Sequence, residues 1–253
     1  MANKVFTGLT MFACIVAMGI TTYAFYAKDW AHFDDGTDDT EFGLWTVTDG
    51  SDSAIDMSWD CYKVLWCEIS DEFSGATALE NSADAWCDQA TAFKKAAMIY
   101  YCCNLVALVL LAKFLVSLTA IMNEKDPGHK RWMYGCAGGF AVLALAGFGA
   151  WWGLTEVAYD ADCDDDDYGS DLVDGDRWKM CAGMGATISI IAAGMMAIAG
   201  ILGIVYTMKL EESAECNLSE DEVPCCGMKI HTMLFANLLW VCIILAMAGI
   251  VVR

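Results

Sequence analysis

The chain has 253 residues, of which 57% are apolar and only 2 are prolines. Its mean hydropathy is positive and its formal net charge is −20. This composition excludes a soluble domain with one large core and predicts a polytopic helical membrane protein whose length fits a single bundle. Residues 27–95 hold 16 acidic and 4 basic side chains and residues 155–180 hold 10 and 2, so these two loops account for the whole excess of negative charge. They present a strongly acidic surface.

Several stretches are apolar enough to cross a hydrocarbon core of about 30 Å, which takes roughly 20 helical residues. The predicted spans are residues 5–26, 96–122, 132–154, 182–208 and 230–252. The first lacks a convincing small-residue cleavage site, so we interpret it as a retained helix and not as a secretory signal. We therefore divide the chain into a four-span core over residues 1–208, a loop over 209–229 and an additional carboxyl-terminal helix over 230–253.

Basic residues next to the spans predict their orientation, because Lys and Arg favour the cytoplasmic side. The amino terminus carries Lys4, and the turn at 123–131 carries Lys125, Lys130 and Arg131. Both are predicted to lie inside the cell. The two acidic loops then lie outside, and residues 209–229 lie inside.

The 13 cysteines divide by compartment under this topology. Outside, where an oxidising environment permits disulfides, lie Cys61, Cys67, Cys87, Cys163 and Cys181. The inner loop holds Cys216, Cys225 and Cys226. Cysteines beside the cytoplasmic face are candidates for S-palmitoylation, and free thiols are the equally weighted alternative.

The first outer loop has the composition of a small folded unit. Residues 41–48 are rich in strand formers, and residues 56–69 alternate aromatic or aliphatic with polar side chains. Residues 49–53 between them have a turn composition. We expect a small antiparallel sheet on the bundle, followed by a short helix over residues 76–95 that leads into the second span.

The second outer loop contains an acidic cluster that would attract cations. Its members are Asp162, Asp164, Asp165, Asp166 and Asp167. The cluster lacks the Gly and the terminal Glu of a helix–loop–helix calcium site. We interpret it as a solvated acidic face without a bound metal.

Spans three and four are rich in small residues at four-residue spacing, which lets helices approach closely in lipid. The pairs are Gly135 with Gly139, Gly149 with Gly153, Ala193 with Ala197 and Ala199 with Gly203. For most of them we expect packing within the bundle. Spans three and four, together with the loop surfaces, are also where we expect contacts between proteins.

The first outer loop contains Trp30, then Gly43-Leu44-Trp45, then Cys61 and Cys67, followed by a helical lead into a span. This order resembles the signature of the claudin and peripheral-myelin-protein superfamily, and the resemblance covers about residues 1–208. The 13-residue gap between Trp30 and Gly43, the basic turn and the compact second outer loop also match its layout. The chain departs from the family in its fifth apolar segment and in its cysteine spacing, since Cys61 lies 16 positions after Trp45 and 6 before Cys67.

The resemblance implies an all-α four-span bundle that carries a small outer sheet tied by a disulfide. The implied pair is Cys61–Cys67, with Cys87 as a competing partner, while Cys163 and Cys181 are disulfide candidates of the second loop. An indole such as Trp30 suits the point where a span leaves the membrane. Leu44 and Trp45, on a strand next to the membrane, would bury against helix ends or lipid. These residues would fix a scaffold whose function lies in what it displays.

The resemblance further implies a structural protein of the plasma membrane that self-associates laterally into strands or arrays among the membrane lipids. Cytoskeletal proteins are candidate partners on the inner side. Acidic outer loops repel each other across a gap, which favours lateral assembly over adhesion. The alternative is a cation-selective channel or channel accessory subunit, because rings of carboxylates select cations at an outer face. Polar groups within the spans are scarce, and Lys113 is the one strongly charged group, which weighs against the channel.

An enzyme is not predicted. The 3 histidines, His32, His129 and His231, lie in three separate loops or loop edges. The sequence contains no nucleophile-elbow motif, no metal-ligand spacing and no phosphate-binding loop. It likewise predicts no cofactor and no nucleic-acid partner.

Overall fold

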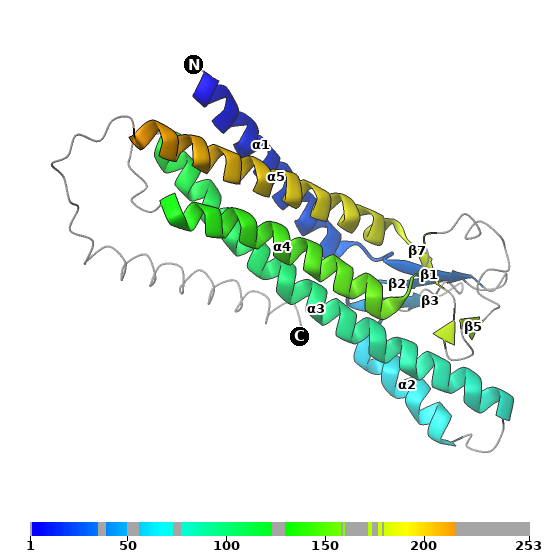
Figure 1. Ribbon diagram of the computed structural model, residues 1–253. Helices are drawn as coiled ribbons and strands as arrows, with labels where there is room; N and C mark the ends of the chain where they lie inside the picture. Colours follow the sequence, from blue (N-terminus) through cyan, green and yellow to red (C-terminus); the bar gives the residue numbers. More distant parts are fainter. Residues whose placement is uncertain are drawn as a thin grey trace.

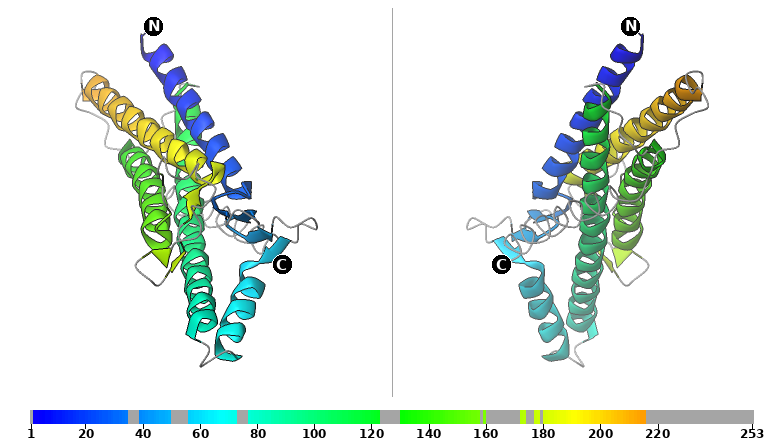
Figure 2. Two further views of the ribbon diagram at one scale, coloured as in Figure 1. Left: turned by 90° about the vertical axis from the view of Figure 1, so that its right-hand side faces the viewer. Right: turned by 90° about the vertical axis from the view of Figure 1, so that its left-hand side faces the viewer.

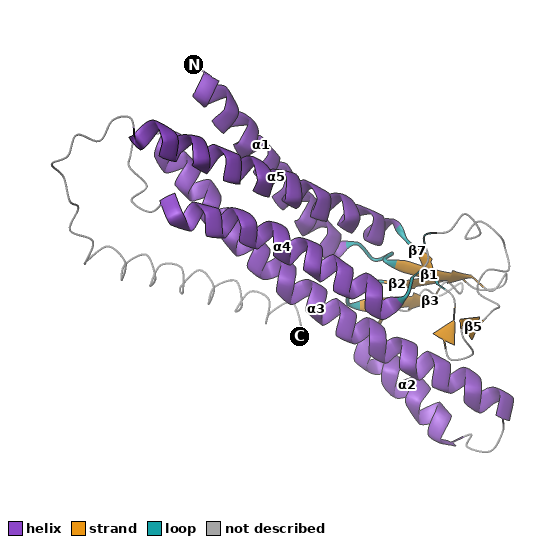
Figure 3. Cartoon of the chain, viewed as in Figure 1, coloured by secondary structure: helices purple, strands orange, loops and turns teal. Residues whose placement is uncertain are grey.

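The computed structural model describes residues 2–34, 39–49, 56–72, 77–122, 130–157, 159, 172–173, 177–178 and 180–215. The long helices are α1 (Ala2–Tyr26), α3 (Thr77–Met122), α4 (Lys130–Thr155) and α5 (Met184–Glu215) (Figures 1 and 3). By length and composition these 4 helices could each cross a membrane. The predicted class, a helical membrane protein with a small antiparallel sheet, is confirmed to this extent. The predicted fifth helix at 230–252 lies outside the described residues.

The four long helices form one bundle. α3 packs against α4, α4 against α5 and α5 against α1, and α1 closes the ring by packing against α3 (Figure 2). Small residues bring α4 and α5 close together, since a Cβ added at Gly200 would lie 2.8 Å from the carbonyl oxygen of Ala137. Close approach of this kind is how helices gain packing energy in lipid.

α3 is much longer than a membrane requires. Its 46 residues make a helix of about 70 Å at 1.5 Å per residue. The hydrocarbon core of about 30 Å accounts for fewer than half of them. The predicted helix over residues 76–95 is therefore confirmed, and it is continuous with the second span.

A shorter helix, α2 (Trp59–Glu72), packs against the first half of α3 and projects with it beyond the sheet (Figure 1). The prediction of a strand over residues 56–69 is wrong beyond β4 (Asp56–Ser58). Trp59, Tyr62 and Trp66 recur at spacings of three and four, which places them on one face of a helix. Burial of that aromatic face against α3 stabilises the helix, and this outweighs the preference for a strand that the alternation of apolar and polar residues indicates.

The main sheet has 5 antiparallel strands in the order β4-β3-β2-β1-β7. β1 (Ala31–Asp34), β2 (Asp39–Phe42) and β3 (Thr46–Asp49) follow α1, and β7 (Cys181–Ala182) pairs with β1 just before α5. The predicted small antiparallel sheet is thus confirmed, although residues 41–48 belong to two strands and the turn between them. A separate ribbon joins β5 (Leu172–Val173) to β6 (Arg177–Trp178).

The sheet, the α2–α3 projection and the near end of the bundle share one aromatic core. Its members include Trp30, Phe42, Trp59, Trp86, Phe93 and Trp151. Ring centroids of Trp59 and Phe93 lie 5.4 Å apart, and those of Phe93 and Trp151 lie 6.2 Å apart. Buried aromatic area of this size dominates the energetics of a small unit, so the sheet is anchored to the helices by packed aromatic rings.

Candidate functional site

Trp30 lies at the centre of the aromatic core, where α1 leads into the sheet. Its side chain is fully buried, its indole Nε1 donates to the carbonyl oxygen of Ala24 at 3.0 Å, and its backbone N donates to the Phe42 carbonyl at 2.8 Å. Its ring packs edge-to-face against the rings of Tyr100 and Trp151, with centroid distances of 4.6 Å and 4.9 Å. A single residue therefore joins α1, α3, α4 and β2.

The Gly43-Leu44-Trp45 tripeptide forms the turn between β2 and β3, and not part of a strand as predicted. The backbone N of Gly43 donates to the Thr46 carbonyl at 2.8 Å. A Cβ at Gly43 would lie 2.7 Å from the carbonyl oxygen of Lys28, so the close approach of the two backbones requires glycine here. The predicted burial of Leu44 is confirmed, since that side chain is 1% exposed.

Trp45 closes the turn against the helix ends. Its Nε1 donates to the carbonyl oxygen of Phe25, near the end of α1, at 3.2 Å. Its ring packs edge-on against Tyr101 of α3 at 4.9 Å. From the other side, the indole of Trp59 donates to the Gly43 carbonyl at 3.0 Å. The turn is thus held by two tryptophan donors, one belonging to the turn itself and one to α2.

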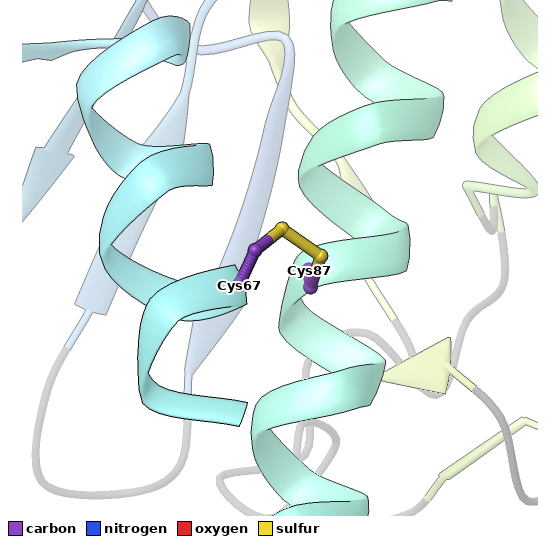
Figure 4. The surroundings of a disulfide bond; sticks show 2 residues. All are labelled: Cys67 and Cys87. Atoms are coloured by element: carbon purple, nitrogen blue, oxygen red, sulfur yellow. A yellow bond between two sulfur atoms is a disulfide. The ribbon is translucent and has the colours of Figure 1, made fainter. Parts of the chain in front are cut away.

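The implied Cys61–Cys67 disulfide is wrong. Both residues lie on α2, where six positions correspond to about 9 Å along the axis, beyond the Cα separation of about 7 Å that a disulfide can bridge. The competing partner is the one used: Cys67 bonds to Cys87 of α3, with a Cα–Cα distance of 4.9 Å (Figure 4). Cys61 is a free and exposed thiol.

The disulfide fastens α2 to α3 far out on the projection, and an ion pair fastens them nearer the sheet. The ammonium of Lys94 contacts the Asp60 carboxylate. The stacked rings of Trp66 and Trp86, 5.8 Å apart, directly precede Cys67 and Cys87 in the sequence. Sequence reasoning missed this helical hairpin, although the aromatic spacing of residues 59–66 was the signal that could have revealed it.

The remaining predicted disulfide positions belong to the second loop. Cys181, on β7, is disulfide-bonded. Cys163 lies outside the described residues, as do the acidic cluster Asp162, Asp164, Asp165, Asp166 and Asp167 and the lipidation candidates Cys216, Cys225 and Cys226. Among the residues that are described, no group of His, Cys, Asp or Glu side chains could hold a metal ion.

The small residues of α4 and α5 divide into an inward and an outward set. Gly139 packs on Leu110 of α3, Gly203 packs on Phe114 and Ala137, and Ala199 is fully buried. In contrast, a Cβ added at Gly135, Gly149 or Gly153 of α4 would meet no atom within 4 Å. Each predicted pair that begins on α4 therefore places at least one glycine on the outer surface of the bundle.

Two exposed tryptophans on α4 indicate where the membrane boundaries lie. Trp132 and Trp152 are 57% and 49% exposed and stand 20 positions apart, which corresponds to about 30 Å of helix. This equals the thickness of a hydrocarbon core, and indoles favour both of its interfaces. Lys113 of α3 lies 4.7 Å from the ring centroid of Trp132, at the end of the bundle away from the sheet.

Three polar side chains within the spans form hydrogen bonds inside the bundle. The hydroxyl groups of Tyr100 on α3 and Ser189 on α5 lie 2.9 Å apart. The amide Nδ2 of Asn104 donates to the carbonyl of Tyr100, one turn back on the same helix. These groups stabilise the bundle and do not line a polar path between the helices in the described part of the chain.

A comparison with protein-family models finds no match for this chain. A comparison with curated proteins finds no match either.

Proposed function

We propose that this protein is a claudin-like structural protein of the plasma membrane that self-associates laterally into strands or arrays. The observation that carries the proposal is the outer face of α4, where Gly135, Gly149 and Gly153 meet no atoms of their own bundle. Glycines on a lipid-facing surface allow the backbone of a second helix to approach closely. The rest of the fold serves this role as a rigid body that holds the face in place.

The signature residues support the claudin-like part of the proposal. Trp30 and the Gly43-Leu44-Trp45 turn join the sheet to four helices, α1 to α4, through indole hydrogen bonds and ring contacts. A sheet fixed in this way moves with the bundle, which is what a repeating unit of a strand requires. The chain resembles in character the strand-forming claudin-like integral protein of the euglenoid pellicle, which links the membrane to the cytoskeleton. A cytoskeletal contact of the inner loops belongs to the same proposal.

The disulfides support the predicted orientation. Cys67, Cys87 and Cys181 are all disulfide-bonded, and all lie at the sheet end of the bundle. Disulfides persist in oxidising compartments and are rare in the cytosol. This favours an extracellular sheet and a cytoplasmic end that carries Lys113 and Trp132.

The test is electron microscopy of the full chain reconstituted into lipid membranes. We expect ordered rows or lattices from the wild type. The double variant Gly149→Leu/Gly153→Leu should fold, because both sites have space, but it should give dispersed particles because leucine blocks close approach. The matched control is Gly8→Leu/Gly19→Leu on α1, whose glycines also meet nothing within 4 Å but lie on another helix. Rows that persist in the α4 variant would contradict the assigned face.

The alternative, a cation channel or channel accessory subunit, depends on the acidic outer cluster, which lies outside the described residues. In the described spans no observation specifically favours it, and the hydroxyl groups of Tyr100 and Ser189 bond to each other within the bundle. Closed rings around a central opening in the same micrographs would favour the channel over the scaffold.

A further inference from the structure

Lys113 is a charged residue within an apolar span. It lies inside the membrane-crossing part of α3 (Ser82–Ala120) and nine positions before the helix ends at Met122, or about 13 Å along the axis. Ionisable side chains at such depth are costly and usually mark a site with a specific partner. The partner of Lys113 therefore needs to be identified.

The described part of the chain supplies an aromatic ring to Lys113 but no countercharge. The ammonium lies 4.7 Å from the ring centroid of Trp132, a cation–π contact that stabilises the charge without neutralising it. Lys113 takes no part in the ion pairs of His32 with Asp29 and of Lys94 with Asp60. The indole N–H of Trp132 also makes no hydrogen bond to another described residue.

We propose that Lys113 and Trp132 form a binding site for the headgroup of an anionic phospholipid, in the leaflet opposite the sheet. The ammonium and the indole N–H are both donors, they belong to adjacent helices, and the ammonium lies 4.7 Å from the ring centroid of Trp132, the residue that marks this membrane boundary. Trp132 is 57% exposed, so its outer side is open to lipid. An acyl chain then has the apolar surface of the spans to lie against.

Charge selects an anionic lipid over a zwitterionic one. In a zwitterionic headgroup the phosphate is already accompanied by a cation of its own, so the headgroup has no net charge. An anionic headgroup has a net negative charge and can act as the counterion of Lys113. Lys130 and Arg131 directly precede Trp132 in the sequence. Basic residues near a membrane surface attract anionic lipids, each by about fivefold in binding.

The test is native mass spectrometry of the full chain in a mild non-ionic detergent, titrated with dioleoyl-phosphatidylglycerol or dioleoyl-phosphatidylcholine. We expect the wild type to bind the anionic lipid several-fold more tightly than the zwitterionic one. Lys113→Gln should weaken binding of phosphatidylglycerol by about fivefold and leave phosphatidylcholine unchanged. Lys95→Gln, which changes an exposed lysine in the first half of α3, is the matched control and should behave as wild type.

Two further measurements complete the design. Lys113→Arg keeps the charge and should restore binding, which separates the site from a folding defect in Lys113→Gln. Glycerol 3-phosphate, a headgroup without acyl chains, should not displace the lipid. Equal binding of the two lipids, full binding by Lys113→Gln, failure of the arginine variant to restore binding, or displacement by glycerol 3-phosphate would each overturn the assignment. None of these outcomes depends on lateral assembly.

Discussion

The carboxylate of Asp29 caps the amino terminus of α5: its Oδ2 accepts a hydrogen bond from the backbone N of Met184 at 3.0 Å. The carbonyl of Asp29 also accepts from the backbone N of Gly185, and the carbonyl of Trp30 accepts from that of Gly183 at 3.1 Å. A helix start carries unpaired N–H groups and the positive end of the helix dipole. The segment after α1 therefore acts as the cap of a helix that begins 155 positions later.

Removing this cap should destabilise the joint between α1, the sheet and α5. We expect Asp29→Ala to lower the free energy of unfolding by about 1 kcal/mol, the usual cost of a lost helix cap. Asp29→Asn should retain most of the stability, because an amide oxygen can still accept. Thermal unfolding of the detergent-solubilised protein measures both. Asp88→Ala, an exposed carboxylate on α3, is the control, and an equal loss there would contradict the capping role.

The turn that contains Gly43 should not tolerate a side chain. Because an added Cβ would lie 2.7 Å from the Lys28 carbonyl oxygen and 3.1 Å from that of Thr46, we expect Gly43→Ala to cost about 1–3 kcal/mol, as overpacking does. Gly19→Ala, on a helical face with nothing within 4 Å, should be neutral or stabilising. The same unfolding assay compares them, and a neutral Gly43→Ala would show that the two backbones can separate.

Residues 96–122, 132–154 and 182–208 could be recognised as spans from sequence because hydropathy over about 20 residues directly reflects transfer into lipid. The sheet could be predicted from residues 41–48 because strand-forming residues cluster there. The turn at 43–45 was missed because Leu44 and Trp45 are themselves strand formers. Only the close approach of the Lys28 backbone, a tertiary contact, reveals why a turn forms at Gly43.

The disulfide and α2 could not be predicted separately. As long as residues 56–69 were expected to be a strand, Cys61 and Cys67 belonged to the sheet and the family pattern suggested their pairing. Once Trp59, Tyr62 and Trp66 are placed on one helical face, Cys67 turns toward α3 and Cys61 away from it. The assignment of residues 56–69 to a strand instead of a helix therefore led to the wrong disulfide prediction.

The corrected disulfide predicts a specific pattern of thiol reactivity. A membrane-impermeant maleimide applied to intact cells should label Cys61 without reductant, and should label Cys67 and Cys87 only after reduction, as read by peptide mass spectrometry. Label on Cys67 before reduction, or a peptide joining Cys61 to Cys67, would contradict the structure. The single variant Cys61→Ser is the control that removes the first label alone.

The same bond should contribute measurably to stability. It closes a loop of 20 positions, and restricting an unfolded chain of that length corresponds to about 3 kcal/mol. The double variant Cys67→Ala/Cys87→Ala should therefore unfold at a lower temperature, with the loss concentrated in the α2–α3 projection. Hydrogen exchange of residues 59–72 should rise while that of α4 stays constant. Uniform loss of protection would mean that the projection unfolds together with the whole bundle.

The hydrogen bond between Tyr100 and Ser189 should couple α3 to α5. The two hydroxyl groups lie 2.9 Å apart in a buried position, and the ring of Tyr100 also contacts Trp30 and Phe25. Tyr100→Phe keeps those ring contacts and removes only the hydroxyl. We expect each of Tyr100→Phe and Ser189→Ala to cost about 1 kcal/mol and the double variant to cost little more, because interhelical hydrogen bonds in membranes contribute roughly 0.6–2 kcal/mol. Strictly additive losses would contradict the coupling, and Tyr26→Phe, an exposed tyrosine at the end of α1, should leave the stability unchanged.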